Sequence, residues 1–300
     1  MIHVVGHTAI DYICRVPRIP GKNESTLVTD RRVFFGGGAA NIAAGIARLG
    51  EPCTLVSAVG GDFDGSPYDL WMRKLGIEQQ FYRVKESNTA TAFIFTDDHH
   101  DQCTFFEWGA SEVFSKKEAQ GFSFVHMATA DPDYNVQVAE NSEFSSFDPG
   151  QDLHRYSKAQ LTAILDKVSI LFANQYELAG MCRILGVGEE DLVAWVPTAV
   201  FTMGKHGSML YQCRESEEIP AIAVDAVDPT GAGDAYRAGF LAGYAKGYEA
   251  SVCCRIGTVT ASFVVEREGS QTNLPDWPRM EERYRAAFGD IPRPDGGEVR

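Results

Sequence analysis

Asp228-Pro229-Thr230-Gly231-Ala232-Gly233-Asp234-Ala235 joins a strand-like stretch, 221–227, to a long helical pattern, 232–246. The small residues Gly231, Ala232 and Gly233 let an anion approach the backbone, and the free N–H groups and dipole of a helix N-terminus favour a bound phosphate. Asp234, in the first turn, can then accept a proton from an attacking hydroxyl group. Taken alone, an ordinary helix cap remains the alternative. The segment matches neither the Walker nor the Rossmann glycine pattern.

Short apolar runs and helical patterns alternate along most of the chain. The alternation predicts an α/β fold in which a mostly parallel central sheet is covered by helices on both faces. The predicted buried strands are 2–5, 54–59, 125–128, 144–147, 170–173 and 200–203. The predicted helices are 39–49, 157–165 with a capping box at its start, 232–246 and 250–265.

Two segments, 12–35 and 81–108, show strand-like alternation with no helical pattern inside them. Within the second, 89–96 and 102–108 are expected to pair as a hairpin. Together the segments predict a small β sheet that forms a lid over a cleft. Because no linker or repeat divides the chain, 1–300 is expected to be one domain. The tail, 291–300, has the composition of a disordered segment.

The composition limits the partners and the compartment. A net charge of −14 argues against nucleic acid or an anionic membrane as a partner. No apolar run reaches the roughly 18 residues of a membrane span. The start of the chain is expected to be a first strand rather than a signal peptide. Seven cysteines without a C-x-x-C pair are typical of a cytoplasmic protein with free thiols.

A second glycine-rich segment is Phe35-Gly36-Gly37-Gly38-Ala39-Ala40-Asn41. Three glycines before a helix can act as a hinge or allow a ligand to contact the backbone. Asn41, one turn into the helix, offers both a donor and an acceptor. A flexible loop followed by a capping asparagine is the alternative at this point.

The two glycine segments resemble, in order and spacing, the signature motifs of the ribokinase-like (PfkB) carbohydrate kinase family. The resemblance extends to about Asp276 and implies an ATP-dependent kinase that acts on an alcohol group, with Mg²⁺ bound alongside ATP. It also implies a parallel-sheet domain with a β lid, and a homodimer formed through that lid.

The resemblance implies roles for individual residues. The catalytic group would be Asp234 with the anion hole of Gly231, Ala232 and Gly233. The substrate would be bound by Asp11, Gly37, Gly38 and Asn41. The Asn174-Gln175-Tyr176-Glu177 segment matches an N-x-x-E motif, in which Asn174 would bind ATP and Glu177 would bind magnesium through water; taken alone, a helix start capped by Asn174 is the alternative. The T-x-G-x-x-G turn would place Thr202, Gly204 and Gly207 at the nucleotide, with a tight strand–strand turn as the alternative.

Asp228 and Thr230 resemble residues that form a monovalent-cation site in some members of the family. Pro229 replaces a commoner threonine, and Asn273 stands where a serine often helps. These two departures leave cation dependence open.

Four segments resemble the broad-specificity nucleoside kinases of methanogenic archaea: 6–11, 146–153, 262–266 and 271–275. This favours the 5′-hydroxyl of inosine, guanosine, adenosine or cytidine as the acceptor. The lid aromatics could stack on a base, or belong to the lid core or a dimer interface: Phe93, Phe95, Phe105, Phe106 and Trp108. Two alternatives stay open, namely a ribokinase-type sugar kinase and a non-catalytic ligand-binding protein on the same fold.

Overall fold

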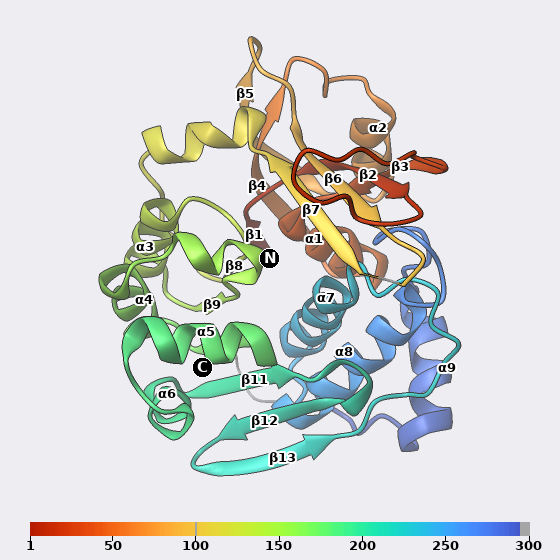
Figure 1. The fold of residues 1–300 in the computed structure, drawn as a ribbon. Helices are drawn as coiled ribbons and strands as arrows, with labels where there is room; N and C mark the ends of the chain where they lie inside the picture. The colour runs from red at the N-terminus through yellow and green to blue at the C-terminus, as the bar shows by residue number, and fades with distance from the viewer. Residues whose placement is uncertain (100, 295–300) are drawn as a thin grey trace.

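The computed structural model describes residues 1–99 and 101–294, which form two sheets. The large sheet has the order β13-β12-β11-β10-β9-β8-β1-β4-β5, and the small sheet has the order β3-β2-β6-β7. In the large sheet, the seven neighbouring strands β5, β4, β1, β8, β9, β10 and β11 run parallel. At the other edge, β12 pairs antiparallel with both β11 and β13. The predicted α/β class, with a mostly parallel sheet and a separate small sheet, is confirmed (Figure 1).

The strands of the large sheet are β1 (Ile2–Val5), β4 (Cys53–Gly60), β5 (Glu78–Val84), β8 (Val125–Met127), β9 (Ser145–Phe147), β10 (Ile170–Asn174), β11 (Thr198–Thr202), β12 (Ser208–Gln212) and β13 (Glu215–Ile219). Those of the small sheet are β2 (Ala9–Arg15), β3 (Asp30–Gly36), β6 (Ala90–Thr96) and β7 (Gln102–Glu107). Each of the six predicted core strands corresponds to one of these strands within a few residues.

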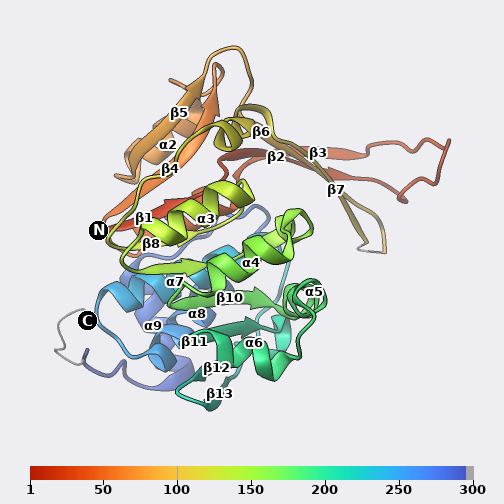
Figure 2. The same ribbon diagram turned by 90° about the vertical axis from the view of Figure 1, so that its left-hand side faces the viewer.

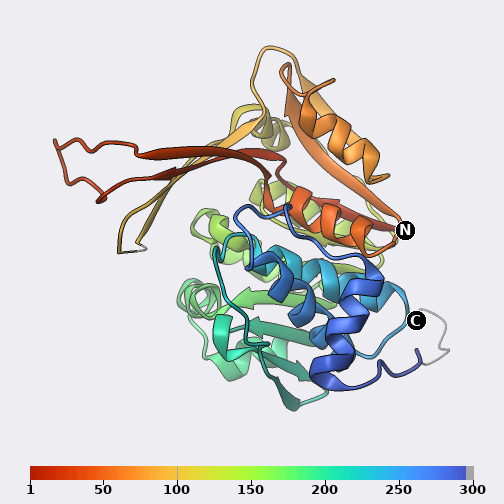
Figure 3. The ribbon, with the colours of Figure 1, turned by 90° about the vertical axis from the view of Figure 1, so that its right-hand side faces the viewer.

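Helices cover both faces of the large sheet (Figures 2 and 3). One face carries α3 (Pro132–Asn141), α4 (Lys158–Leu165), α5 (Gln175–Leu185) and α6 (Glu189–Trp195). The other carries α1 (Gly38–Arg48), α2 (Pro67–Lys74), α7 (Ala232–Ala245) and α8 (Ala250–Val264), with α9 (Trp277–Phe288) packed on α8. Short 3₁₀ turns lie at η1 (Gly109–Lys116), η2 (Gly150–Arg155) and η3 (Gly204–His206). Within the described part of the chain, no helix is both long enough and apolar enough to cross a membrane.

The central strands are buried on both sides, which explains why apolar residues occupy successive positions along them. In β4, Leu55 packs into the core under α1 and α7, while Val56 packs into the core under α3 to α5. Neighbouring side chains of a strand point to opposite faces, so a strand between two helical layers has apolar residues on both faces.

The small sheet projects sideways from the large one, as the two side views show (Figures 2 and 3). The predicted hairpin is present, because β6 and β7 pair antiparallel. Strands β2 and β3 also pair antiparallel, and β2 lies parallel to β6 between the two hairpins. Two segments far apart in the sequence therefore share one sheet.

Three expectations differ from the structure or lie partly outside it. Residues 81–84 belong to β5 of the large sheet, because they pair with the end of β4 rather than with the lid. The stretch 221–227 is not a strand; at its end, Val227 donates to the carbonyl of Val265, in the loop after α8. The expected disordered tail, 291–300, falls largely on 295–300, which lie outside the described residues.

Candidate active site

A cavity of about 940 Å³ opens at the carboxyl ends of the parallel strands, which is where ligands bind in open α/β sheets. Five of its lining residues end β1, β8, β9, β10 and β11 or follow them within two positions: His7, Thr129, Asp148, Asn174 and Thr202. The small sheet supplies the other wall through alternate residues of β6 and β7: Ala92, Ile94, Gln102, Thr104 and Phe106. Both sheets therefore build the same cavity.

The glycine-rich turn before α7 lies in this cavity with all four of its predicted residues, Gly231, Ala232, Gly233 and Asp234. Gly231 is the N-cap and has a φ of 79°, a conformation that favours glycine. A β-carbon there would lie 2.4 Å from the β-carbon of Ser270. The turn thus presents the N-terminus of a 14-residue helix to the cavity, which suits an anion.

Asp234 is held by one of its two carboxylate oxygens. The side-chain N–H of Asn41 donates to Oδ2 at 2.8 Å. The other oxygen, Oδ1, lies 3.7 Å from the position that a β-carbon on Gly38 would occupy. Burial raises the pKa of Asp234 to about 6, although the bond from Asn41 opposes the shift. An ionised Asp234 above that pH has the protonation state that a general base needs.

The glycine triplet 36–38 runs between the two carboxylates that were predicted to contact substrate. A β-carbon on Gly36 would lie 2.1 Å from Oδ2 of Asp11, and one on Gly38 would approach Asp234. Burial, and then the negative charge of Asp234, raise the pKa of Asp11 to about 7. Gly37, with a φ of 90°, is the N-cap of α1, and Asn41 follows in its first turns. The structure thus brings Asp11, Gly37, Gly38, Asn41 and Asp234 together.

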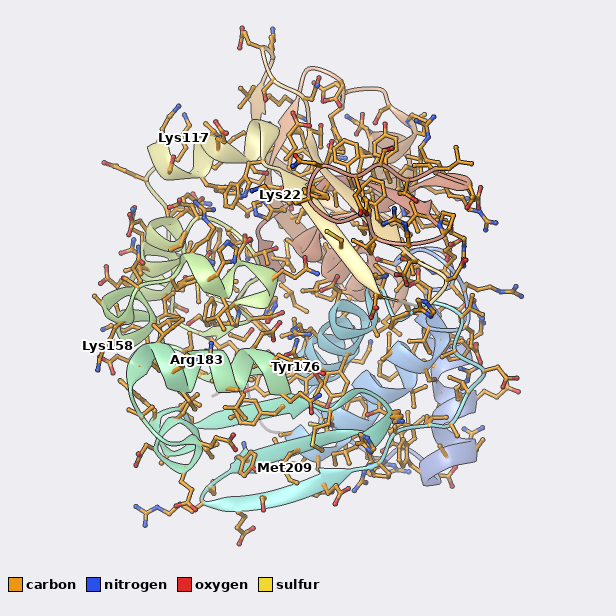
Figure 4. All side chains as sticks on the ribbon, viewed as in Figure 1. Lys22, Lys117, Lys158, Tyr176, Arg183 and Met209 are labelled. Atoms are coloured by element: carbon orange, nitrogen blue, oxygen red, sulfur yellow. The ribbon has the colours of Figure 1, made fainter. Side chains whose placement is uncertain are left out.

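Asn174 and Glu177 cap the start of α5 and cap each other. Oδ1 of Asn174 accepts the backbone N–H of Glu177 at 2.9 Å, and Oε2 of Glu177 accepts the N–H of Asn174 at 2.7 Å. Both residues line the cavity. Between them in sequence, Tyr176 is 77% exposed and lies at the cavity end of α5 (Figure 4).

The β11–β12 turn contributes part of what was predicted. Thr202 and Gly204 line the cavity, whereas Gly207 does not. Gly207 instead closes the turn: its carbonyl accepts the N–H of Met203 at 2.7 Å, and its φ is 90°. A β-carbon there would lie 2.1 Å from the carbonyl oxygen of Ile219, so the geometry of the turn alone requires glycine at this position.

Asp228 and Thr230, the predicted cation pair, lie in the turn before α7 and are joined by a hydrogen bond. Thr230 lines the cavity, but Asp228 does not. The two carboxylate oxygens of Asp228 accept backbone N–H groups, one from Thr230 at 3.0 Å and one from Gly269 at 3.2 Å. The amide oxygen of Asn273 accepts from Arg279 at 3.3 Å. In this arrangement, Asp228 joins the turn before α7 to the loop at Gly269, and the oxygen of Asn273 is bonded to α9.

Arg237 is the main cavity residue that sequence reasoning missed. Its side chain is 5% exposed, forms an ion pair with Asp148 and lies 3.7 Å from Glu177. It stands three residues after Asp234, so both lie on one side of α7. That spacing, in a helix made otherwise of small and apolar residues, was the available signal. Arg237 puts a buried positive charge next to the N-terminus of α7, where a phosphate would need one.

Gly231→Ala tests the turn before α7. We expect kcat to fall about 10²–10³-fold, because the new β-carbon would push the backbone away from Ser270 and move the N–H groups that face the cavity. Gly65→Ala is a matched control, since Gly65 has a φ of 78° and an open surrounding. The control should lose about 1–2 kcal/mol of stability and keep its kcat. Steady-state kinetics and thermal unfolding would measure both; a kcat loss below tenfold in Gly231→Ala would contradict the role of this turn.

The chain belongs to the pfkB family of carbohydrate kinases, whose model matches residues 1–277. It is therefore an ATP-dependent kinase, as the signature motifs predicted. A nucleoside kinase of Methanocaldococcus jannaschii is 43% identical over 289 residues, covering 94% of this chain and 96% of the relative. Its crystal structure has a TM-score of 0.88 at 42% identity and covers 95% of this chain and 98% of that one.

Two further relatives extend the comparison. A nucleoside kinase of Methanothermobacter thermautotrophicus is 42% identical over 299 residues, covering 96% of each chain. The nucleoside kinase of Burkholderia thailandensis in complex with inosine is 28% identical, with a TM-score of 0.88 and coverage of 98% and 99%. The same enzyme in its ADP-inosine complex is 27% identical, with a TM-score of 0.85 and coverage of 100% of this chain and 99% of that one. The predicted similarity to the nucleoside kinases of methanogens is confirmed.

An ATP-dependent kinase of this family implies a divalent metal with its nucleotide, and the cavity residues fit one that arrives with ATP. Within residues 1–99 and 101–294, no cluster of three or more His, Cys, Asp or Glu side chains could hold a metal unaided. Glu177 and Asp148 nevertheless line the cavity, and Mg²⁺ is commonly bound by one or two carboxylates, phosphate oxygens and water. Burial, and then the charge of Asp148, raise the pKa of Glu177 to about 7, and a nearby cation would lower it.

Proposed function

We propose that this kinase transfers the γ-phosphoryl group of ATP to the 5′-hydroxyl of nucleosides. The observation that carries the proposal is the placement of Asp11 and Asp234 on either side of the glycine triplet, in a cavity that continues along the inner face of the small sheet. The relatives named above, which are nucleoside kinases, support the same substrate class.

The ribose would lie across the glycine triplet. Asp11 can accept hydrogen bonds from two vicinal hydroxyl groups, and Asn41 and the backbone of Gly37 and Gly38 would fix the rest of the sugar. This leaves the 5′-hydroxyl next to Oδ1 of Asp234, the oxygen that Asn41 does not occupy. The missing β-carbons of the triplet provide the space.

In the transfer step, Asp234 would accept the proton of the 5′-hydroxyl as this oxygen attacks the γ-phosphorus, and the bond from the γ-phosphorus to its bridging oxygen would break to release ADP. The backbone N–H groups of Gly231, Ala232 and Gly233 would stabilise the negative charge on the phosphoryl oxygens. Glu177 would hold Mg²⁺ through water, and the ion would neutralise phosphate charge. Asn174, Thr202 and Gly204 would bind the nucleotide on the same side. Closure of the small sheet over the acceptor would exclude water.

The base would lie against the inner face of the small sheet. Of the lid aromatics, Phe106 and Trp108 line the cavity, while Phe93, Phe95 and Phe105 do not. The guanidinium of Arg155 lies 3.7 Å from the ring centroid of Trp108 and 3.8 Å from Asp131. The positive charge of Arg155 therefore already interacts with Trp108 and Asp131. This favours a flat neutral group of the substrate over a phosphate group in this part of the cavity.

An acceptor panel tests the proposal, with Mg·ATP as donor and inosine, guanosine, adenosine, cytidine, ribose and fructose 6-phosphate as acceptors. We expect kcat/KM on at least one nucleoside to exceed that on ribose by about 10²-fold or more, because ribose leaves the base pocket empty. Equal or better turnover of ribose would support a ribokinase-type sugar kinase instead. Tight binding of nucleosides without any transfer would support the non-catalytic alternative.

The same proposal includes a homodimer through the small sheet and a cytoplasmic enzyme. The outer face of the small sheet carries exposed apolar side chains, including Val33, Phe93 and Phe105. Such a surface suits a second copy of the chain. A molar mass of one chain by light scattering at micromolar concentration would contradict the dimer. Cation dependence stays open, and activity measured with Na⁺ or K⁺ as the sole monovalent cation would decide it.

A further inference from the structure

A chain of side-chain hydrogen bonds connects Asp234 to an indole outside the cavity. Nε1 of Trp71, on α2, donates to Oε1 of Gln271 at 2.9 Å. Nε2 of Gln271 donates to Oδ1 of Asn41 at 2.9 Å and to the hydroxyl of Tyr68 at 2.8 Å. Nδ2 of Asn41 then donates to Asp234 at 2.8 Å. Asn41, Tyr68 and Gln271 are all buried.

The direction of every bond in this chain follows from its first donor. An indole N–H can only donate, so the atom of Gln271 that faces Trp71 must be the amide oxygen. The NH₂ group of Gln271 must then face Asn41 and Tyr68. Asn41 consequently turns its oxygen to Gln271 and its NH₂ group to Asp234, which is the orientation that stabilises an ionised carboxylate.

The reversed direction would have the opposite effect on Asp234. If Gln271 turned over, two donors would face each other at Trp71, and a buried amide would lose a partner. If Asn41 turned over, its carbonyl oxygen would face the carboxylate of Asp234. That contact is favourable only when Asp234 carries a proton, and a protonated Asp234 cannot act as a base.

The same glutamine also supports the glycine triplet. The hydroxyl of Tyr68 accepts from Gln271 and donates to the carbonyl oxygen of Gly36 at 2.8 Å. Gly36 ends β3 and packs against the carboxylate of Asp11. One amide group therefore contacts both the residue that holds Asp234 and the residue that holds the triplet.

We propose that Trp71 and Gln271 are positioning residues which fix the direction of this hydrogen-bond chain, so that Asn41 donates to Asp234 and keeps it ready to accept a proton. The proposal rests on the proposed role of Asp234 as the base. Trp71 and Gln271 lie outside the set of residues that line the cavity, so they act through Asn41 rather than on the substrate.

Other charges also face Asp234 and would remain in the variants that test the proposal. Arg237 lies on the same helix, and Asp148 follows β9. Asp11 on β2 and Glu177 on α5 are also coupled to Asp234 by charge. Trp71→Phe leaves all four groups unchanged and adds no charge, so a shift in the titration of Asp234 in that variant can be assigned to the hydrogen-bond chain. Gln271→Glu also adds a negative charge near Asn41, which acts on Asp234 in the same direction.

The experiment measures kcat against pH on the best nucleoside for Trp71→Phe and Gln271→Glu. Trp195→Phe is the matched control. Trp195 lies on α6, away from the site, and its indole N–H also donates to a side-chain oxygen, that of Asp166 at 2.7 Å. In Trp71→Phe the donor is lost without any change in charge. In Gln271→Glu the side chain can no longer donate to Asn41, so Asn41 is expected to turn over.

We expect the acid limb of kcat to move to higher pH by about half a unit in Trp71→Phe and by about one unit or more in Gln271→Glu. At pH 9 both variants should come within about threefold of wild type, because Asp234 is then ionised in either orientation. Trp195→Phe should follow the wild-type curve.

Two outcomes would overturn the proposal: an acid limb that does not move in either variant, or a kcat that falls equally at every pH, as loss of structure alone would cause. Asp234→Asn, run in parallel, separates this failure from failure of the proposed function. If Asp234→Asn is inactive and the limbs do not move, only the positioning role is wrong. If Asp234→Asn remains active, the base itself is misassigned.

Discussion

Asp234→Asn is expected to lower kcat by about three to four orders of magnitude while the protein folds normally and still binds ATP and nucleoside. The loss is this large because the amide cannot accept the proton of the attacking hydroxyl, although it keeps an oxygen to which Asn41 can donate. Steady-state kinetics give kcat, and calorimetric titration of the nucleoside shows whether binding is retained.

The same variant should be more stable than wild type at pH 8. Burial raises the native pKa of Asp234 from 3.8 to about 6, so its ionised form opposes folding. The stability associated with the raised pKa is present below about pH 4 and is lost as the pH rises through about 6. Replacing the carboxylate should therefore add up to about 3 kcal/mol at pH 8 and little at pH 4. Urea unfolding at the two pH values would show this.

Asp133→Asn is the control for that experiment. Asp133 also lies in the first turn of a helix, α3, but it is exposed. We expect its kcat to stay within about twofold of wild type and its stability to change by less than about 1 kcal/mol. If Asp234→Asn retained more than a tenth of the wild-type kcat, Asp234 would not be the base.

Arg237→Met should destabilise the protein by about 3–5 kcal/mol at pH 8, because it leaves Asp148 and Glu177 buried without their counter-charge. The cost should shrink as the pH falls. Burial already raises the pKa of both carboxyl groups, and loss of the arginine raises them further. Groups with raised native pKa values destabilise the fold only where they are ionised, so protonation near pH 5 should recover part of the loss.

Urea unfolding at pH 8 and pH 5 measures this prediction. Arg255→Met is the control, because Arg255 pairs with Glu217 near the surface and its loss should cost less than about 1 kcal/mol. Adding Asp148→Asn to Arg237→Met should restore part of the stability lost at pH 8, because Glu177 still lacks its counter-charge. An equal loss at both pH values would mean that the arginine acts by packing against Phe172 rather than by charge.

The residues that sequence reasoning found are those whose chemistry is local. The turn before α7 combines small residues with an aspartate in the first helical turn, and both features can be seen within eight positions. The Asn174–Glu177 capping box and the hairpin of β6 and β7 are local in the same sense. Such features need no knowledge of how distant strands are ordered.

The features that sequence reasoning missed depend on distant partners. Arg237 is a cavity residue only because Asp148 and Glu177 reach it from two other elements. Trp71 and Gln271 are 200 positions apart, and nothing in either local sequence indicates that they are bonded. The stretch 221–227 has the alternation of a strand, but a strand also needs a neighbouring strand to pair with. In the structure, its last residue, Val227, donates to the carbonyl of Val265 instead.

The division of the cavity between two sheets has an evolutionary consequence. Asp11, proposed to bind the acceptor, and the wall of the proposed base pocket belong to the small sheet, whereas Asp234 lies on a helix that packs on the large sheet and the turns proposed to bind the nucleotide follow strands of the large sheet. Substitutions on the inner face of β6 and β7 can reshape the acceptor pocket and leave the N-terminus of α7 unchanged. A lineage built on this plan can therefore acquire new acceptors by drift in one sheet, while selection on the other preserves the chemistry of phosphoryl transfer.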